Sequence, residues 1–378
     1  MNHPIYLDYN ATTPVDKEVA DAMLPFITRF FGNPSSANDD GRQAKDAISK
    51  ARRQVASLIN AHEEEIIFTS GGTESNNHAI RGIASANRHK GNHIITSAIE
   101  HPAVTNVCDY LESIGFDITR IPVDKNGRVV ASDVEKAIRP ETILITIMHA
   151  NNEVGTIQPI AEIGEIAGKH QIVFHTDAAQ SPGKIEADVN KLNVDLLSVA
   201  GHKLYAPKGV GALYIKSGVK IDNILFGAGQ EKGLRPGTEN VPYIVALGKA
   251  CEIAKRDFEI NTGNMFSAKE RLLSGLKAGL GDRVHLNGDF WGVLPNTLSV
   301  AFPGVEAHTL ASAIEKEVLI STGSACHANF IKLSPVLKAM RIAPETGAGT
   351  VRISTGKNTS TEEVDQAVEI LTQTIIKF

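Results

Sequence analysis

The strongest constraint on the fold is an alternation of short apolar runs with longer helical stretches over the first half of the chain. The runs are too short for helices and rich in β-branched residues, as buried strands are. They are Ile66–Phe68, His93–Thr96, Ile118–Ile121, Thr142–Ile147, Ile172–His175 and Val194–Val199. Helical patterns between most of them cover Glu74–Lys90, Pro102–Ile114, Ser132–Ile138 and Pro159–His170. This alternation predicts an α/β fold with a mostly parallel sheet covered on both faces.

Local signals refine this prediction. Ser132 and Glu135 have the spacing of a capping box at the start of their helix. After a Gly-rich loop the rhythm changes, and a long helical region runs from about Val241 to Leu280. Beyond it, the strand patterns are Asn296–Phe302 and Thr350–Ser354, and the helical patterns are Glu306–Glu317 and Thr361–Ile376. This α+β arrangement predicts a second domain.

Composition limits the classes of partner. The 378 residues carry a formal net charge of -5, so nucleic acid and anionic membrane are not expected as partners. The N-terminal sequence lacks a basic segment followed by an apolar run, and no stretch approaches the roughly 20 apolar residues that span a bilayer. We therefore expect a cytoplasmic protein. Cys108, Cys251 and Cys326 form no CxxC pair, which argues against a disulfide framework and against a metal site.

Two candidate site residues lie where predicted strands end. Asp177 follows the run that ends at His175, and Lys203 follows the run Val194–Val199. Ligands of open α/β sheets bind outside the carboxyl ends of the strands, so both side chains are expected at one pocket. A lysine can bind pyridoxal 5′-phosphate (PLP) as a Schiff base, and an aspartate can keep its pyridine nitrogen protonated. A surface ion pair is the alternative for an isolated aspartate and lysine.

Other polar residues at predicted strand ends suit the same pocket, each with a structural alternative. Gly72 and Thr73 open a helix whose amides and hydroxyl can hold phosphate, although Gly-Gly is more often a tight turn. His101 can stack on a flat ring and exchange protons near neutral pH, whereas most single histidines are structural. Asn152 and Gln180 can bind a substrate carboxylate or a phenolic oxygen, or can cap their own loops.

Cys326 differs from the other two cysteines. It lies in a small, polar, glycine-containing stretch, which predicts a mobile loop with an accessible thiol. Cys108 and Cys251 lie in apolar helical patterns, as cysteines used as small hydrophobic residues do. An accessible thiol can become a thiolate nucleophile, and we therefore interpret Cys326 as the candidate nucleophile.

Taken together, these segments resemble the cysteine desulfurase family (NifS/IscS type) of class V, fold-type I PLP-dependent enzymes. The resemblance covers nearly the whole chain. It implies a large domain at residues 16–255 with a seven-stranded sheet, and a small α+β domain at residues 1–15 and 256–378 that carries the mobile cysteine loop at about 321–333. The motifs are Tyr6-Leu-Asp-Tyr-Asn-Ala-Thr-Thr-Pro, Phe31-Gly-Asn-Pro-Ser-Ser, Thr69-Ser-Gly-Gly-Thr-Glu-Ser, Met148-His-Ala-Asn-Asn-Glu-Val-Gly, Asp177-Ala-Ala-Gln, Gly201-His-Lys and Gly323-Ser-Ala-Cys.

The resemblance also implies how the cofactor is held. Lys203 would bind the PLP aldehyde, Asp177 would pair with the pyridinium nitrogen, His101 would stack on the ring, and Gln180 would contact the phenolic oxygen. Thr238, on an exposed loop, would reach the phosphate of the partner subunit in a homodimer. The residues implied around the phosphate within one subunit are Gly72, Thr73, Ala200 and His202.

The substrate implied by the resemblance is L-cysteine. Asn152 and Arg352 would hold its carboxylate, for which the bidentate fork of arginine is suited. Lys203 would remove the α-proton, and the Cys326 thiolate would then attack the substrate sulfur. The products would be L-alanine and a persulfide on Cys326 for a sulfur-acceptor protein.

Two features depart from the family pattern. Many relatives have serine where this chain has Ala200, so one side-chain contact to the phosphate is lost and weaker cofactor binding is expected. The sequence ends at Phe378, directly after the last predicted helix, whereas housekeeping relatives have a tail that docks an iron–sulfur scaffold protein. The acceptor is therefore left open between an iron–sulfur scaffold, a tRNA-thiolation protein and another sulfur-modification partner.

Three rival functions remain to be weighed. A selenocysteine lyase or a related PLP-dependent β-elimination would use Lys203 and Asp177 without an absolute need of Cys326. A non-catalytic sulfur-relay scaffold has no chemical need of a Schiff-base lysine. Aminotransfer to a keto acid leaves the segment Gly323–Cys326 unexplained. The sequence therefore predicts a cysteine desulfurase that serves iron–sulfur cluster assembly or another sulfur-modification pathway.

Overall fold

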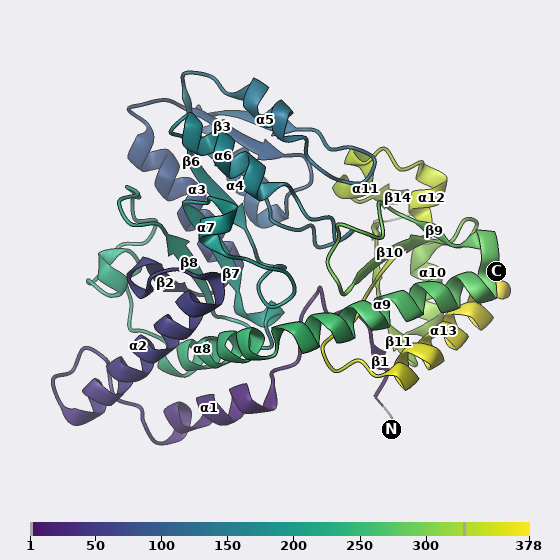
Figure 1. The fold of residues 1–378 in the computed structure, drawn as a ribbon, viewed down its shortest axis with the longest axis horizontal. Coiled ribbons are helices and arrows are strands. Elements are labelled where there is room, and N and C mark those ends of the chain that lie inside the picture. Colours follow the sequence, from purple (N-terminus) through teal and green to yellow (C-terminus); the bar gives the residue numbers. More distant parts are fainter. Residues whose placement is uncertain (1–2, 328–329) are drawn as a thin grey trace.

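The computed structural model describes residues 3–327 and 330–378 of the chain (Figure 1). Its largest feature is a seven-stranded sheet in the order β2-β8-β7-β6-β5-β3-β4, in which only β8 runs antiparallel to its neighbours. This confirms the predicted α/β fold with a mostly parallel sheet. The strands are β2 (Ile66–Thr69), β3 (His93–Ser97), β4 (Asp117–Ile121), β5 (Thr142–Thr146), β6 (Val173–Asp177), β7 (Leu196–Ala200) and β8 (Gly211–Ile215).

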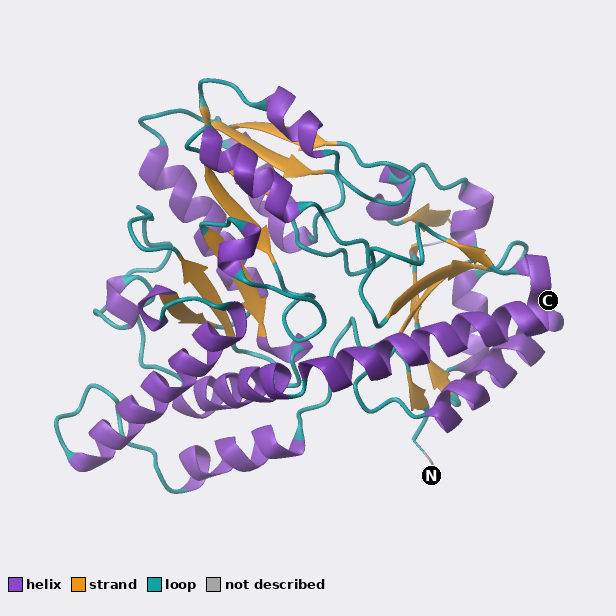
Figure 2. Ribbon diagram, viewed as in Figure 1, coloured by secondary structure: helices purple, strands orange, loops and turns teal. Residues whose placement is uncertain are grey.

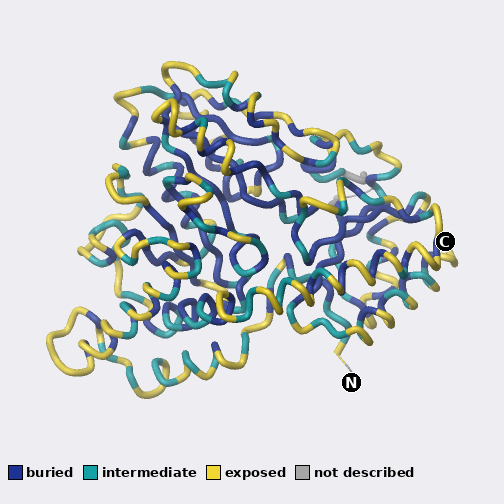
Figure 3. Tube along the Cα trace, in the orientation of Figure 1, coloured by how far each residue is buried: buried dark blue, intermediate teal, exposed yellow. Residues whose placement is uncertain are grey.

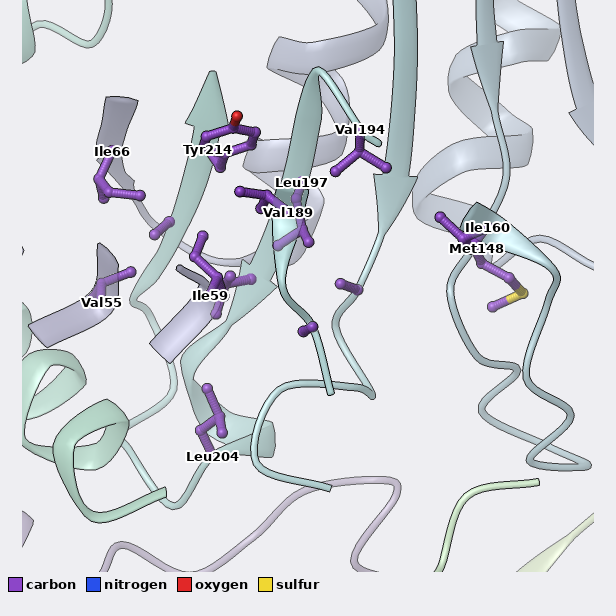
Figure 4. Packing of buried hydrophobic residues seen from close by; sticks show 14 of the residues in the cluster. Val55, Ile59, Ile66, Met148, Ile160, Val189, Val194, Leu197, Leu204 and Tyr214 are labelled. Atoms are coloured by element: carbon purple, nitrogen blue, oxygen red, sulfur yellow. The ribbon is translucent and has the colours of Figure 1, made fainter. Parts of the chain in front are cut away.

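Helices cover both faces of this sheet (Figure 2). Neighbouring residues of one strand point to opposite faces, so Leu196 packs in the core under α3 (Gly72–Asn87) and α4 (Pro102–Ser113) while Leu197 packs in the opposite core. The second core contains α2, α6 and α8, and Figure 4 shows part of it. The other helices of this part are α1 (Lys17–Thr28), α2 (Asp39–Ile59), α5 (Ala131–Ala137), α6 (Ile160–Lys169), α7 (Val189–Leu192) and α8 (Val241–Arg256).

A smaller antiparallel sheet has the order β12-β15-β10-β9. The helices α9 (Phe258–Leu280) and α13 (Thr361–Ile376) pack with it around a separate core. The N-terminal strand β1 (Ile5–Tyr6) pairs with β11 (Val318–Leu319) beside this core. The remaining elements are β9 (His285–Leu286), β10 (Thr297–Ala301), β12 (Ser321–Thr322), β15 (Thr350–Ser354), α10 (Ala307–Ile314), α11 (Pro335–Ala339) and α12 (Pro344–Ala348).

The two parts of the molecule are joined by the long helical region that the sequence predicts. It consists of α8 and α9, which meet at Asp257 and run nearly end to end along the lower side of Figure 1. Figure 3 shows that the central strands of both sheets are buried while much of the outer helical surface is exposed. Some residues in the range predicted for the small domain contact the other part of the molecule: Val336, Leu337 and Met340 pack in the core of the large sheet. The domain limits at residues 15/16 and 255/256 stay a prediction.

Two local predictions are wrong. The Ser132/Glu135 capping box does not form, because α5 already begins at Ala131 with Val130 as its N-cap and no side-chain capping bond. The predicted loop around Cys326 is instead a pair of strands, β13 (Ser324–His327) and β14 (Phe330–Leu333), with Cys326 opposite Ile331. Pairing these strands satisfies backbone donors and acceptors that a loop leaves to solvent. The connection at 328–329 lies outside the described residues.

Among the described residues, no helix is long and apolar enough to cross a lipid bilayer.

The end of α13 offers a matched test of the small core. Ile375 is 0% exposed and Ile376 is 61% exposed on the same helix. Ile375→Ala is expected to lower the free energy of unfolding by about 2–5 kcal/mol, because it removes buried methyl groups and leaves a cavity. Ile376→Ala is expected to change it by no more than about 0.5 kcal/mol. Urea denaturation measures both, and equal losses would contradict the packing described for this helix.

Candidate active site

A pocket of about 430 Å³ lies beyond the carboxyl ends of β5, β6 and β7. Its size is in the range of small-molecule and cofactor sites. It brings together most of the site residues predicted from the sequence, although they come from widely separated segments. Those that line it are Gly72, Thr73, His101, Asn152, Asp177, Gln180, Ala200, His202, Lys203 and Arg352.

One end of the pocket is the N-terminus of α3. Gly71 precedes this helix with φ 147°, a conformation that favours glycine, and no side chain caps the helix. The first amides of a helix lack partners within the helix and carry its positive end, so this end suits an anion such as phosphate. A Cβ atom added at Gly72 would lie 3.3 Å from the Cβ of Ala200. A larger side chain at position 72 would crowd the space in front of these amides.

Asp177 ends β6 and is 5% exposed. Its Oδ2 accepts a hydrogen bond from Asn76 Nδ2 at 2.7 Å, and its Oδ1 accepts one from the backbone amide of Ala179 at 2.9 Å. Burial raises the pKa of this carboxyl, and the two donors oppose the rise. Both recorded partners are neutral, so the surface ion pair considered as the alternative does not describe this residue.

Lys203 ends a 3₁₀ turn that follows β7. Its Nζ donates to the backbone carbonyls of Asn10 at 2.5 Å and Ala11 at 2.7 Å. Burial, with a smaller contribution from the positive charge of Arg352, lowers the pKa of Lys203 to about 8. A lysine with this pKa has a substantial neutral fraction near neutral pH, which is the form that acts as a base or as a nucleophile toward an aldehyde.

The two histidines have different surroundings. His101 is the N-cap of α4, and its Nδ1 accepts a hydrogen bond from the backbone amide of Ala103 at 3.1 Å. Its ring is therefore held at the mouth of the pocket, where partial loss of hydration lowers its pKa and Asp177 opposes that shift. His202 has Nδ1 3.2 Å from Thr12 Oγ1. Burial lowers the pKa of His202 to about 4, with neighbouring lysines adding to the effect.

Arg352 projects from β15 of the small sheet into the same pocket. One of its terminal nitrogens donates to Asp8 Oδ1 at 2.6 Å and to Ser321 Oγ at 2.7 Å. The other donates to the backbone carbonyl of Asn152 at 3.0 Å. Nε is buried without a hydrogen-bond partner among the described residues. The guanidinium is therefore held in one orientation beside the pocket, as recognition of a carboxylate requires.

Thr238 is the one predicted site residue with a described side chain that does not line this pocket. Thr238 is exposed in the loop between the 3₁₀ turn Glu231–Gly233 and α8. Only the backbone of Cys326 is described, in β13, and its thiol lies outside the described part of the chain. Cys108 and Cys251 are each 0% exposed, and burial raises the pKa of both thiols to about 12. This confirms that these two cysteines serve as buried small residues.

The sequence analysis missed a group of polar residues that hold the site together. Asn10 accepts hydrogen bonds from Lys203 and from Gln180 Nε2, the latter at 3.0 Å, through its backbone carbonyl. Its side chain donates to Thr297 Oγ1 at 2.7 Å and accepts from Asn296 Nδ2 at 3.0 Å. The motif at Tyr6–Pro14 was the available signal, because it is part of the family resemblance, but nothing in it indicates a role for Asn10. The other missed residues are Asp8, Asn76, Lys184 and Ser321.

Comparisons with known proteins agree with this geometry. The family model described as "Aminotransferase class-V" matches residues 5–367. The "Cysteine desulfurase IscS" of Methanosarcina thermophila is 50% identical over 378 residues, which cover 100% of this chain and 93% of that protein. A solved structure entitled "NIFS-LIKE PROTEIN" has a TM-score of 0.94 and 37% identity, with 100% of both chains covered. Another, "SspA in complex with cysteine", has a TM-score of 0.82 and 40% identity, covering 94% of this chain and 99% of that chain.

Asn10→Ala tests the network that supports the pocket. The substitution removes one of the two acceptors of Asn296 and of Lys184 and the donor to Thr297, all of them buried, so a loss of about 2–3 kcal/mol in the free energy of unfolding is expected. Asn190→Ala, at an exposed asparagine bonded to the Asn60 carbonyl, is expected to cost less than about 1 kcal/mol. Thermal or urea denaturation of both variants gives the comparison. Equal costs would show that the Asn10 side chain does not hold the pocket together.

Proposed function

The chain belongs to the aminotransferase class-V family and is a PLP-dependent cysteine desulfurase, and from this premise we propose which of its residues carry out the reaction. The reaction removes sulfur from L-cysteine and leaves L-alanine. One observation carries the proposal: Lys203, Asp177 and Arg352 line a single pocket whose other end is the N-terminus of α3. Each charged group then has a complementary part of the cofactor or the substrate to bind.

The residues of the pocket fit PLP. The uncapped N-terminus of α3 at Gly72 and Thr73, together with His202, would hold the phosphate. Asp177, whose recorded partners are neutral, would pair with the protonated pyridine nitrogen, and Gln180 would face the phenolic oxygen. When bound, PLP supplies an aldehyde for a Schiff base and a ring that accepts the electron pair of a substrate carbanion.

The chain's own groups would then handle the substrate. Arg352 and Asn152 hold its carboxylate, using the guanidinium that Asp8 and Ser321 already orient. Lys203 takes the α-proton in its neutral form, because its lowered pKa keeps that form populated near neutral pH. His101, whose Nδ1 accepts from a backbone amide, can exchange protons at Nε2.

Cys326 is proposed as the nucleophile. Its thiolate forms a bond to the substrate sulfur while the bond between that sulfur and the substrate β-carbon breaks. The electron pair of the broken bond goes to the β-carbon, which is then protonated to give alanine, and the sulfur stays on Cys326 as a persulfide. Ser321 supports this assignment, since its bond to Arg352 brings the chain to the edge of the pocket five residues before Cys326.

The proposal also includes a homodimer and an acceptor protein for the sulfur. The exposure of Thr238 supports a role at the phosphate of a partner subunit in a homodimer. A sulfur-acceptor protein would take the persulfide sulfur, and the IscS name of the relatives favours one that serves iron–sulfur cluster assembly. The buried, unpaired thiols of Cys108 and Cys251 agree with a reducing, cytoplasmic setting.

Substitution of Cys326 separates the desulfurase from a lyase that does not need this thiol. Cys326→Ala is expected to keep the visible absorption band of bound PLP and to lose alanine formation by at least about 100-fold, because the sulfur has no nucleophile to accept it. Alanine and sulfide are quantified after L-cysteine is added. Cys251→Ala, at a buried thiol outside the pocket, is the control and is expected to turn over within about twofold of the native rate. Unimpaired alanine release from Cys326→Ala would favour a selenocysteine-lyase type of reaction, which leaves alanine without an absolute need of this thiol.

The lowered pKa of Lys203 predicts a pH dependence for cofactor attachment to the apoenzyme. Only the neutral amine attacks the aldehyde, so the rate is expected to rise about tenfold per pH unit below pH 8 and to level off above it. The rate is followed by absorbance after apoenzyme and PLP are mixed between pH 6 and 10. A rate that keeps rising up to pH 10 would mean that Lys203 has the pKa of an ordinary lysine. Lys203→Ala provides the baseline without covalent attachment.

A further inference from the structure

Behind the pocket lies a second buried lysine with no part in the proposed reaction. Lys184 is 6% exposed and follows β6 by seven residues. Its Nζ donates to Gln180 Oε1 at 2.8 Å and lies 3.4 Å from Asn10 Oδ1. A lysine ammonium has donors only, so both contacted oxygens must be acceptors. Lys184 on one side and the Asn10 carbonyl on the other therefore fix which end of the Gln180 amide is oxygen and which is nitrogen.

The orientation of that amide has a direct consequence for the pocket. With Oε1 held by Lys184, Gln180 Nε2 is on the other side, where it donates to the Asn10 carbonyl at 3.0 Å. The same carbonyl accepts from Lys203. An amide nitrogen has two hydrogens, and Gln180 lines the pocket, so its second N–H is available to an oxygen bound there.

The charged surroundings of Lys184 are unusual for a buried lysine. Burial lowers the pKa of Lys184 to about 7, and part of this lowering comes from the positive charges of Lys203 and Arg352. On its other side, a cavity of about 20 Å³ is lined by Asp16, Tyr205 and Lys357. There Lys357 donates to Asp16, so that carboxylate already has a cation. Burying an amine here is costly, which calls for a role that an apolar residue would not fill.

We propose that Lys184 is a positioning residue that holds the Gln180 amide with its N–H toward the phenolic oxygen of the bound cofactor. Lys184 does not line the pocket and would act through Gln180, which does. The inference rests on the proposed function, because it assigns the oxygen that Gln180 serves. It adds to that function a lysine whose positive end polarises the amide, so that the N–H is a stronger donor.

The test is the pH titration of the visible absorption band of PLP in the holoenzyme. An N–H donated to the phenolic oxygen, and a cation near it, both disfavour the protonated form of the cofactor linkage. Lys184→Met removes the cation and releases Gln180 Oε1, which loosens the hold on the amide, so the midpoint of the titration is expected to rise by about one pH unit. Lys184→Gln keeps a hydrogen-bond donor but loses the charge. Its midpoint is expected to lie between that of the native protein and that of Lys184→Met. A midpoint unchanged in Lys184→Met would overturn the proposal.

Lys269 provides a matched control for the loss of a buried lysine. It is 1% exposed in the small core, where its Nζ lies 4.5 Å from the Phe290 ring centre and 3.4 Å from two backbone carbonyls. Lys269→Met is expected to lower the stability of the enzyme and to leave the midpoint of the band unchanged. An equal shift in this variant would mean that Lys184→Met acts through general destabilisation, against the proposal.

A double-variant cycle tests whether Lys184 acts through Gln180. In a Gln180→Ala background, Lys184→Met is expected to shift the midpoint by less than half as much as it does alone. A full shift in that background would overturn the positioning role. Should Lys184→Met fail to fold, the same cycle is run with Lys184→Gln. A native protein that shows no visible band with PLP would refute the proposed function itself, whereas a native band with an unshifted variant refutes this inference alone.

Discussion

The rest of the site depends on the hydrogen bonds that the backbone carbonyl of Asn10 accepts. Lys203 from the end of β7 and Gln180 from the end of β6 both donate to this one oxygen. The Asn10 side chain reaches Thr297 and Asn296 at the start of β10 in the small sheet. A segment near the N-terminus thus joins the strand ends of one sheet to the other sheet. The pocket exists only where these three parts meet, since no single part supplies both the lysine and the arginine.

The charges of the pocket follow from the same geometry. Lys203, Lys184 and Arg352 lie close enough for their positive charges to act on one another, and burial disfavours the charged form of each lysine. The neutral form of Lys203 is thereby populated near neutral pH in a pocket that still attracts anions through Arg352 and the N-terminus of α3. The two requirements of the chemistry, a basic amine and an electropositive site, are compatible because arginine stays charged when lysine does not.

Much of this arrangement was predictable from the sequence, and the reason is periodicity. Buried parallel strands are continuous apolar runs, so β3, β5 and β7 are visible in the sequence, and the sheet rule then places Asp177 and Lys203 at one edge. The errors were local. α5 begins one residue earlier than predicted and lacks the expected capping box, and the stretch around Cys326 forms a strand that pairs with β14. Neither the start of α5 nor the strand pairing around Cys326 is determined by the spacing of apolar residues.

The supporting residues were not predictable, because their partners are remote in the sequence. Asp8 and Arg352 are 344 positions apart and meet only because β15 lies beside the N-terminal segment. Lys184 is four residues from Gln180, a spacing that brings side chains together on a helix, but this segment forms turns and has no helical pattern from which the contact could be read. A sequence pattern can propose a catalytic lysine, since its chemistry is distinctive. A lysine that orients a neighbouring amide becomes visible only when the donors and acceptors around that amide are counted.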